Sequence, residues 1–377
     1  MSSESLRQSV DQLLPSFDPV RFVAVDGSAL EPPAGYSRPP DAVLVEAFHR
    51  MVVGRRFDAQ ATVLTRQGRL AVYPSSRGQE ACQIGSVLAL RAEDWLFPTY
   101  RDSMALFARG LDPVELLTLL RGEWHCGYDP TVWRTAPQCT PLATQTVHAV
   151  GLADALRRRG RGGVVLVLVG DGGTSEGDFH EALNFAGVLR APVVFLVQNN
   201  GYAISVPLAR QSAAPALAFR GVGYGVSAEQ VDGNDLVATL AVLSAAVERA
   251  RAGGGPSLVE AHTYRVSAHT NADDASRYRE EAEVARWRAA DPVERLERYL
   301  RGRELLTDAD VAAAEAAGER AAEELRKGLG ERMQVDPLEM FTHVFAEPTP
   351  QLVEQRAQLA AELAAGGAGG EEVGRDG

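Results

Sequence analysis

VVLVLVGDGG, residues 164–173, places six consecutive aliphatic side chains directly before a glycine-rich turn. A short aliphatic run bounded by glycines is typical of a strand that is buried on both faces of a parallel sheet. The turn after such a strand lies at the carboxyl edge of the sheet, where ligands bind. Its glycines let a bound group approach the backbone, and the N–H groups of the following helix suit a diphosphate. On its own, however, such a turn more often only caps a helix.

Two similar aliphatic runs follow, at residues 193–197 and 257–261. Apolar residues recur at helical spacing over 179–189 and 236–251, between the predicted strands. Strands that alternate with helices indicate an α/β fold, because each parallel connection needs a crossover helix. We therefore predict a doubly wound parallel sheet with flanking N- and C-terminal helices.

Helices are also predicted outside this alternating region. Apolar residues recur at helical spacing after Asp41, which can cap its helix, and again after Gly78. A further helix is predicted over residues 112–120, with a proline in its first turn. Thr307 and Asp310 have the spacing of a capping box, so a helix is expected to begin there.

The predicted domain organisation has four parts. Residues 1–40 contain six prolines, which predicts an extended arm that lies on a surface of this chain or of a partner. Residues 41–300 form the predicted ligand-binding domain, and residues 301–363 form a C-terminal helical region. Residues 364–377 are mostly Gly, Ala and Glu, a composition typical of a disordered tail.

The charge balance limits the kinds of partner that we expect. The chain has 38 Lys and Arg against 50 Asp and Glu, a formal net charge of −12, which repels nucleic acid phosphates and anionic lipid surfaces. Its longest aliphatic run is six residues, whereas a bilayer span needs about 20. We therefore expect neither a nucleic acid partner nor a membrane partner.

Targeting and cysteine patterns favour a cytoplasmic location. The first 20 residues contain Glu4, Asp11 and Asp18 and no apolar block, so neither a secretory signal nor an Arg-rich transit peptide is predicted. The chain has three cysteines, Cys82, Cys126 and Cys139. Their number is odd and their spacing does not suit a metal, which favours reduced thiols.

Polar side chains also follow the second predicted strand, in the sequence QNNGY from Gln198 to Tyr202. Asn200 should therefore emerge at the same sheet edge as Asp171. One carboxylate and one amide oxygen suit a hard divalent ion that keeps several ligands from a substrate, as Mg²⁺ does. The alternative is that Asn199 and Asn200 only form a turn, although buried carboxamides need partners. The pair favours a magnesium diphosphate site.

These motifs resemble a known family. The sequence Gly170-Asp171-Gly172, followed after 26 residues by Asn199-Asn200, resembles the fingerprint of thiamine diphosphate enzymes. The segments around it resemble the alpha subunit of 2-oxo acid dehydrogenase complexes, and the similarity runs from about Val43 to Leu300. The segments with the closest similarity are Gly170–Phe179, Gln198–Ser205 and Tyr264–Tyr278. The resemblance implies that residues 41–300 bind the diphosphate half of thiamine diphosphate.

The resemblance also implies roles for individual residues. Asp171, Asn200 and the backbone carbonyl of Tyr202 would bind Mg²⁺, while Gly172 and Gly173 would contact the cofactor. Carried over in this way, the family pattern agrees with the magnesium site that the residue types favour.

Three more residues match cofactor-contacting positions of the family. Tyr100 and Arg101 match a Tyr-Arg pair that reaches the diphosphate, which suits a planar cation. Without the resemblance, a surface ion pair between Arg101 and Asp102 would be preferred. His269 matches a histidine that contacts the cofactor and is the expected catalytic residue, since imidazole can donate to phosphate and move protons. A lone loop histidine is otherwise usually just solvated.

A last segment resembles a potassium site of branched-chain members. The implied ligands are Cys139, Pro141, Thr144 and Gln145, and the same segment would place Thr140 and Leu142 at the cofactor. A hydrophobic helix start after a proline explains these residues equally well. The chain departs from the family at Gln198, where mammalian branched-chain members have an arginine that binds the phosphate, and at Cys139, where a serine is common. Gln198 is kept as a cofactor-binding residue, although the phosphate contact can shift to Arg101.

The implied function is oxidative decarboxylation of a 2-oxo acid on thiamine diphosphate, with transfer of the acyl group to a lipoyl-bearing acyltransferase. The family carries a required Glu on a separate beta subunit, so we expect this chain to work only within an α₂β₂ assembly. Residues 141–145 and 200–205 resemble branched-chain members more closely, so the resemblance favours a branched-chain 2-oxo acid as the substrate, with pyruvate or acetoin as alternatives.

Two alternatives from other classes remain. A non-catalytic scaffold or regulatory subunit would be favoured if a magnesium ligand or the histidine were missing. A metal-dependent phosphohydrolase would use Asp171 together with Asp273 and Asp274, and would release phosphate without thiamine.

Overall fold

The computed structural model describes residues 10–122, 126–330 and 336–366. The chain divides into two units, residues 1–330 and 331–377. The first unit contains the sheet and the site, and the second contains a short helix pair.

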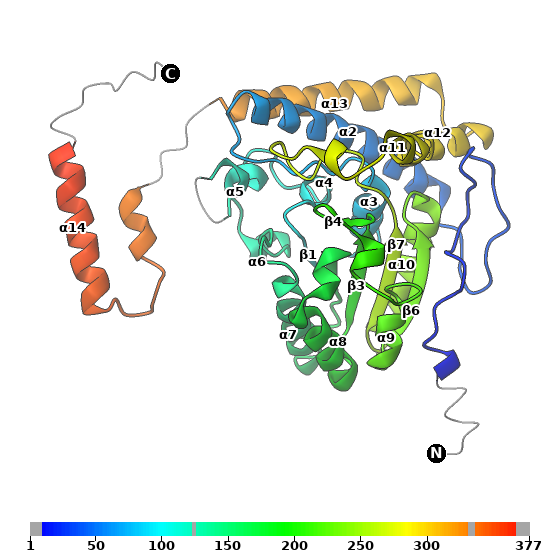
Figure 1. Ribbon diagram of the computed structural model, residues 1–377, viewed down its shortest axis with the longest axis horizontal. Coiled ribbons are helices and arrows are strands. Elements are labelled where there is room, and N and C mark those ends of the chain that lie inside the picture. Colours follow the sequence, from blue (N-terminus) through cyan, green and yellow to red (C-terminus); the bar gives the residue numbers. More distant parts are fainter. Residues whose placement is uncertain (1–9, 123–125, 331–335, 367–377) are drawn as a thin grey trace. The chain divides into compact units, whose positions relative to one another are not determined.

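A five-stranded parallel sheet, in the order β1-β2-β3-β7-β6, forms the centre of the first unit (Figure 1). Its strands are β1 (Trp95–Phe97), β2 (Val165–Gly170), β3 (Val193–Asn199), β6 (Ser227–Asp232) and β7 (Ser257–His262). Gly170 pairs with Gln198, and Asn199 pairs with His262, so β2, β3 and β7 end side by side. The predicted doubly wound α/β fold is confirmed.

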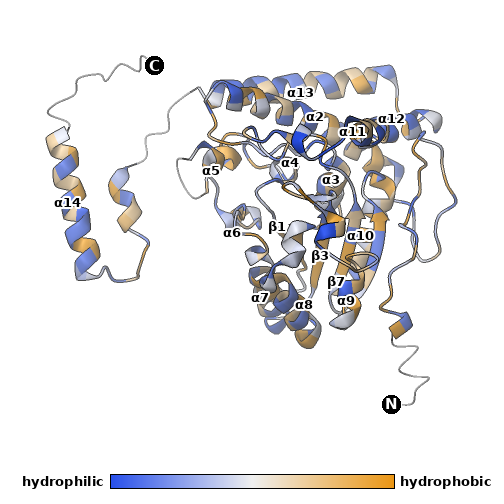
Figure 2. Ribbon diagram, in the orientation of Figure 1, coloured by the Kyte–Doolittle hydropathy of each residue, from blue (hydrophilic) through white to orange (hydrophobic). Residues whose placement is uncertain are grey.

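Helices cover both faces of the sheet, because alternate strand residues point in opposite directions. Leu166 and Leu168 of β2 belong to a buried cluster with α3 (Glu80–Leu88) and α10 (Leu236–Arg251). Val165 and Val167 belong to a second cluster with α7 (Thr144–Arg158) and α8 (Gly177–Leu189). The central strands are accordingly hydrophobic along their length, which Figure 2 shows in orange. Buried on both faces, such strands carry no polar alternation.

A further layer of helices lies outside α3. It consists of α2 (Asp41–Arg66), α11 (Glu281–Ala289), α12 (Pro292–Gly302) and α13 (Asp308–Gly328), and it contacts α3 through α2 and α12. Figure 1 shows α13 lying along α2. Thr307 and Asp310 form the predicted capping box at the start of α13. The predicted helices after Asp41 and Gly78 are confirmed as α2 and α3. The predicted cap is wrong, because Asp41 is the first residue of α2, Pro40 holds the cap position without a side-chain hydrogen bond, and the Asp41 carboxylate accepts from Arg303 instead.

The prediction of one continuous α-helix over residues 112–120 is wrong. The structure has a 3₁₀ turn, η1 (Glu115–Leu117), followed by the four-residue α5 (Thr118–Arg121). Asp112 accepts hydrogen bonds from the N–H groups of Val114 and Glu115 through its side chain, which caps the segment and delays helix formation. Gly122 then ends α5 in the left-handed conformation, with φ 77°.

The remaining elements of the first unit are short. They are α4 (Ser103–Ala108), α6 (Pro130–Trp133), η2 (Gly172–Ser175), β4 (Tyr202–Ala203), β5 (Val206–Pro207), η3 (Leu208–Arg210), α9 (Phe219–Gly223) and η4 (Ala275–Arg277). The second unit contains η5 (Pro337–Phe341) and α14 (Pro350–Gly366), neither of which has a buried side chain. None of the helices in the described part of the chain is long and apolar enough to span a bilayer.

The N-terminal segment lies on the chain's own sheet. Val20 exchanges backbone hydrogen bonds with the β6 residues Gln230 and Asp232, at 2.9 and 3.1 Å. Phe22 and Val23 are buried, and both of their N–H groups donate to the Asp235 carboxylate at 2.7 Å. The segment therefore covers an edge of the sheet that would otherwise be open.

The predicted domain boundaries stay a prediction. Residues 308–328, assigned by sequence to a separate C-terminal region, pack on α2 inside the first unit. Of the predicted tail, residues 364–366 end α14, and residues 367–377 lie outside the described part of the chain.

Candidate functional site

A cavity of about 500 Å³ lies at the carboxyl edge of the sheet. Its walls come from the turns after β1, β2, β3 and β7 and from residues 139–145, which lead into the first turn of α7. Most of the residues predicted for the site line it, namely Tyr100, Arg101, Cys139, Thr140, Leu142, Gln145, Asp171, Gly172, Gly173, Gln198, Asn200, Tyr202 and His269. Folding thus gathers side chains that are far apart in the sequence around one space.

The two predicted metal-binding side chains come from neighbouring strand ends. Asp171 is 1% exposed, and burial raises the pKa of its carboxyl group. It accepts a hydrogen bond from Gln211 at 3.0 Å, but no Lys, Arg or His among the described residues forms an ion pair with it. A buried carboxylate without a cation is unfavourable, so the site fits a divalent ion, which Asn200 and the Tyr202 carbonyl can help to bind.

The backbone around this pair is closely packed. A Cβ atom on Gly172 would lie 2.7 Å from the Cβ atom of Ala203. The turn after β2 therefore meets the turn after β3 at a distance that only glycine permits. This contact holds Asp171 and Tyr202, one residue away on either side, against the same space.

Arg101 does not form the ion pair with Asp102 that the sequence alone would favour. It is 5% exposed and donates to the Ser75 carbonyl at 3.1 Å and to the His269 carbonyl at 3.0 Å. Asp102 instead accepts from Thr99 and Gln198. The guanidinium group is thus fixed in the cavity wall, as binding of a phosphate requires.

His269 is held by two guanidinium groups and is not simply solvated. Its Nδ1 atom lies 3.1 Å from Arg101 Nη2 and 3.1 Å from Arg265 Nη1. Guanidinium nitrogens only donate, so Nδ1 accepts and the proton of the neutral ring is on Nε2. Burial, reinforced by both arginines, lowers the pKa of His269 to about 4. The ring of Tyr100 packs edge-on against it, with 6.1 Å between the ring centres.

The predicted potassium ligands do not all line the cavity. Thr144 Oγ1 donates to Asp178 at 3.3 Å, and the Pro141 carbonyl lies 3.1 Å from the Cys139 sulfur. Gln145 donates to the Leu168 carbonyl at 2.8 Å, while its buried Oε1 has no partner among the described residues. The potassium site stays a prediction.

Sequence reasoning missed three residues of the site. Arg265 is 1% exposed and also donates to the Ile204 carbonyl at 2.7 Å. Gln79 lies between Gln198 and Asn200 and bonds to both, and Gln211 bonds to Asp171. Arg265 lies in the 264–278 segment that resembles the family, so that similarity could have identified it. Gln79 had no comparable signal, because only its contacts distinguish it from other residues at a helix start.

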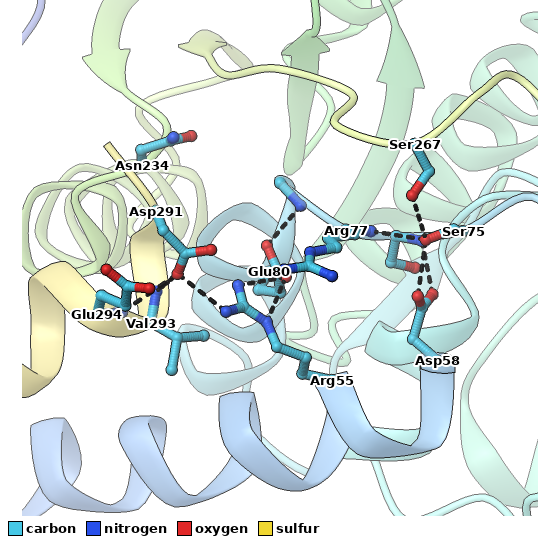
Figure 3. Close-up of polar contacts among 12 residues, drawn as sticks. Arg55, Asp58, Ser75, Arg77, Glu80, Asn234, Ser267, Asp291, Val293 and Glu294 are labelled. Atoms are coloured by element: carbon cyan, nitrogen blue, oxygen red, sulfur yellow. Dashed lines mark hydrogen bonds and ion pairs between the residues drawn. The ribbon is translucent and has the colours of Figure 1, made fainter. Parts of the chain in front are cut away.

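Two side chains on α2, Arg55 and Asp58, hold the segment that contributes Gln79 to the cavity wall (Figure 3). Asp58 accepts from Ser75 Oγ and from the Ser76 N–H group, both at 2.7 Å. One turn earlier, Arg55 donates to Glu80 at 2.6 Å and to Asp291 at 2.9 Å. Helix α2 therefore fixes both ends of residues 75–80, the segment that contains Gln79.

The phosphohydrolase alternative is not supported by this geometry. Asp273 accepts hydrogen bonds from the His269 N–H group and the Tyr278 hydroxyl, at 2.7 and 2.5 Å. Within the described ranges, no group of three or more His, Cys, Asp or Glu side chains is placed to hold a metal. Asp171 is therefore not part of an all-carboxylate metal cluster there.

Comparison with known proteins gives concordant matches. Residues 49–328 match the family model described as "Dehydrogenase E1 component". The chain is 44% identical over 364 residues to the 3-methyl-2-oxobutanoate dehydrogenase subunit alpha of Mycobacterium tuberculosis, covering 97% of this chain and 99% of that one. It is 42% identical over 267 residues to the pyruvate dehydrogenase E1 component subunit alpha of Staphylococcus aureus, covering 70% and 72%.

Proposed function

The chain belongs to the dehydrogenase E1 component family, and on that premise we propose that it is the alpha subunit of a branched-chain 2-oxo acid dehydrogenase. The observation that carries the proposal is the meeting of Asp171, Asn200, Arg101 and His269 around one cavity of suitable size. The near-complete coverage of the M. tuberculosis relative supports a branched-chain 2-oxo acid such as 3-methyl-2-oxobutanoate as the substrate. Pyruvate is the second candidate, supported by the S. aureus relative.

Thiamine diphosphate, when bound, supplies an electron sink for decarboxylation. Asp171, Asn200 and the Tyr202 carbonyl would hold Mg²⁺, and the cation would in turn hold the diphosphate. Arg101 would donate to the diphosphate from a fixed position. The buried carboxylate of Asp171, which forms no ion pair among the described residues, supports this assignment, because a bound cation offsets the unfavourable free energy of burying it.

His269 would act at the reacting atoms. With Nδ1 engaged by two arginines, Nε2–H is the group left to donate a hydrogen bond to a phosphate oxygen or to an oxygen of the reacting substrate. A pKa well below neutrality keeps the ring uncharged at physiological pH. All the proposed ligands and His269 are present, which favours an enzyme over a non-catalytic scaffold.

The proposal includes partners and a location. A beta subunit would complete the active site in an α₂β₂ assembly, and a lipoyl-bearing acyltransferase would receive the acyl group. A potassium ion near residues 139–145 and a cytoplasmic location also belong to the proposal.

Co-expression with candidate beta subunits tests it. The purified complex should turn over 3-methyl-2-oxobutanoate with an artificial electron acceptor, and should need both Mg²⁺ and thiamine diphosphate. The chain purified alone should be inactive. A higher kcat/KM for pyruvate would favour the second candidate, and turnover by the isolated chain would contradict the need for a beta subunit.

A further inference from the structure

A chain of hydrogen-bonded side chains runs from Asp102 to the proposed metal ligand Asn200. Gln198 donates to Asp102 at 2.7 Å, Gln79 donates to Gln198 at 3.0 Å, and Asn200 donates to Gln79 at 3.3 Å. We propose that Asp102 is a positioning residue, which sets the orientation of the Asn200 carboxamide through this relay. The inference rests on the proposed function, because the orientation of this carboxamide matters only if Asn200 binds Mg²⁺.

Asp102 anchors the relay as an acceptor. Its side chain is fully buried. One oxygen accepts from the backbone N–H and the hydroxyl of Thr99, at 2.7 and 2.6 Å, and the other accepts from Gln198. Burial raises the pKa of Asp102, whereas its hydrogen bonds from Thr99 and Gln198 lower it. In the ionised form, which these contacts favour, the carboxylate offers no proton, so Gln198 turns its NH₂ group toward it.

The orientation of each following carboxamide is then determined. Gln198 has its nitrogen at Asp102, so its oxygen faces Gln79, which must donate with Nε2. The oxygen of Gln79 therefore faces Asn200, which must donate with Nδ2. This leaves Oδ1 of Asn200 as the atom available to a cation. The N–H group of Tyr202 reaches the same oxygen at 3.3 Å, so the turn and the relay agree.

Burial makes the relay effective. Gln79, Gln198 and Asn200 are 2%, 2% and 6% exposed, so water cannot compensate a reversed link. A link in which two oxygens or two NH₂ groups face each other leaves buried polar groups unpaired. The relay also gives a role to Gln198, at the position where mammalian branched-chain members have an arginine.

The test is a double-mutant cycle on the two ends of the relay, Asp102 and Asn200, which make no direct hydrogen bond. In the Asp102→Asn variant, the oxygen of the new amide must stay at the Thr99 N–H group, so its NH₂ group faces Gln198. Gln198 and Gln79 then reverse, and Gln79 presents its NH₂ group to that of Asn200. The displaced carboxamide should weaken Mg²⁺ binding by about 10- to 100-fold, the usual effect of losing a partner of a metal ligand.

In the Asn200→Asp background, the Asp102→Asn substitution should have the opposite effect on Mg²⁺ affinity. Asn200→Asp alone places a carboxylate opposite the oxygen of Gln79, which is a repulsive contact. Adding Asp102→Asn reverses the relay so that Gln79 donates to the new carboxylate, and the Mg²⁺ affinity should rise. Simple loss of a nearby negative charge predicts weaker Mg²⁺ binding in both backgrounds.

The measurement uses the complex with its beta subunit. Mg²⁺ affinity is obtained by calorimetry from the Mg²⁺ dependence of thiamine diphosphate binding, and Mn²⁺ affinity from electron paramagnetic resonance without cofactor. Melting temperatures report whether each variant folds. Asp58→Asn is the matched control, because this buried carboxylate bonds to no member of the relay. Its substitution should change the Mg²⁺ affinity in the same direction whether residue 200 is Asn or Asp.

Gln79→Met gives a second route that leaves Asp102 intact. It should weaken Mg²⁺ binding in the Asn200 background and strengthen it in the Asn200→Asp background. Effects of the same sign in both backgrounds, or no measurable binding in any variant with aspartate at position 200, would overturn the relay. If the wild-type complex shows no Mg²⁺-dependent cofactor binding, the proposed function fails as well, which separates the two failures.

Discussion

The Nδ1 atom of His269 lies 3.1 Å from Nη2 of Arg101. Because the arginine can only donate, this contact fixes the tautomer of the neutral ring and leaves Nε2–H for chemistry. The same guanidinium nitrogen also donates to the His269 carbonyl, so the backbone and the ring of this residue are oriented together.

Replacing His269 should affect turnover much more than stability. In His269→Gln, the backbone contacts to Arg101 and Asp273 remain, so we expect the melting temperature to change by less than about 4 °C. Turnover should fall by about 10² to 10⁴, as for a lost acid–base group. The full reaction with the lipoyl partner and the partial reaction with a dye acceptor should be compared. Wild-type rates in both would show that His269 has no catalytic role.

The same variant tests the low pKa of His269. The folded chain holds this pKa at about 4, against 6.5 for the free side chain, so between these values the unfolded chain binds more protons. The wild-type protein should therefore lose stability as the pH falls from about 6.5 toward 4, relative to His269→Gln. The measurement is the difference in melting temperature between the two proteins across that range. A difference that does not change with pH would contradict the buried neutral ring.

Asp171→Ala should abolish Mg²⁺-dependent binding of thiamine diphosphate, because the remaining oxygens cannot hold a small hard cation. Calorimetry on the complex measures this directly. Glu181→Ala is the control, because Glu181 is exposed on α8. The complex with this variant should bind the cofactor with wild-type affinity. Unchanged affinity in Asp171→Ala would remove this residue from the metal site.

Two neighbouring arginines on α2 should differ sharply in their contribution to stability. Arg55 bonds to the fully buried Glu80, so Arg55→Leu leaves a buried charge without its partner and should lower the free energy of unfolding by about 3–5 kcal/mol. Arg56 pairs with Glu319, which is 67% exposed, and Arg56→Leu should lower it by less than about 1 kcal/mol. Urea unfolding measures both. Equal losses would show that the Arg55 contacts in Figure 3 do not stabilise the fold in this way.

The central strands were predictable because burial on both faces leaves a continuous aliphatic pattern, as in β2 and β3. The edge strands were not. β1 has only three residues, and β6, with the sequence SAEQVD, carries polar side chains. The pattern of β6 becomes clear only with residues 20–23, which supply its edge contacts from more than 200 positions earlier in the chain.

The site was predictable to the extent that its residues lie in sequence motifs. Asp171 and Asn200 follow strands, and their meeting is a consequence of parallel pairing. The fixed position of Arg101 depends on Ser75 and His269, which no local pattern brings to it. Asp102 and Gln79 similarly gain their roles from hydrogen bonds between distant segments, and pattern periodicity contains no information about such bonds.

The attachment of residues 75–80 to α2 has a consequence for the entropy of ligand binding. The N–H groups of Ser76 and Gly78 donate to Asp58 and Glu80, both at 2.7 Å, so this part of the cavity wall is ordered before any ligand arrives. Ordering a flexible backbone costs about 1–2 kcal/mol per residue, and a ligand that meets a loose segment must supply that free energy. Here the folding of α2 has already supplied it. Cofactor binding at this wall should therefore retain more of its contact free energy as affinity.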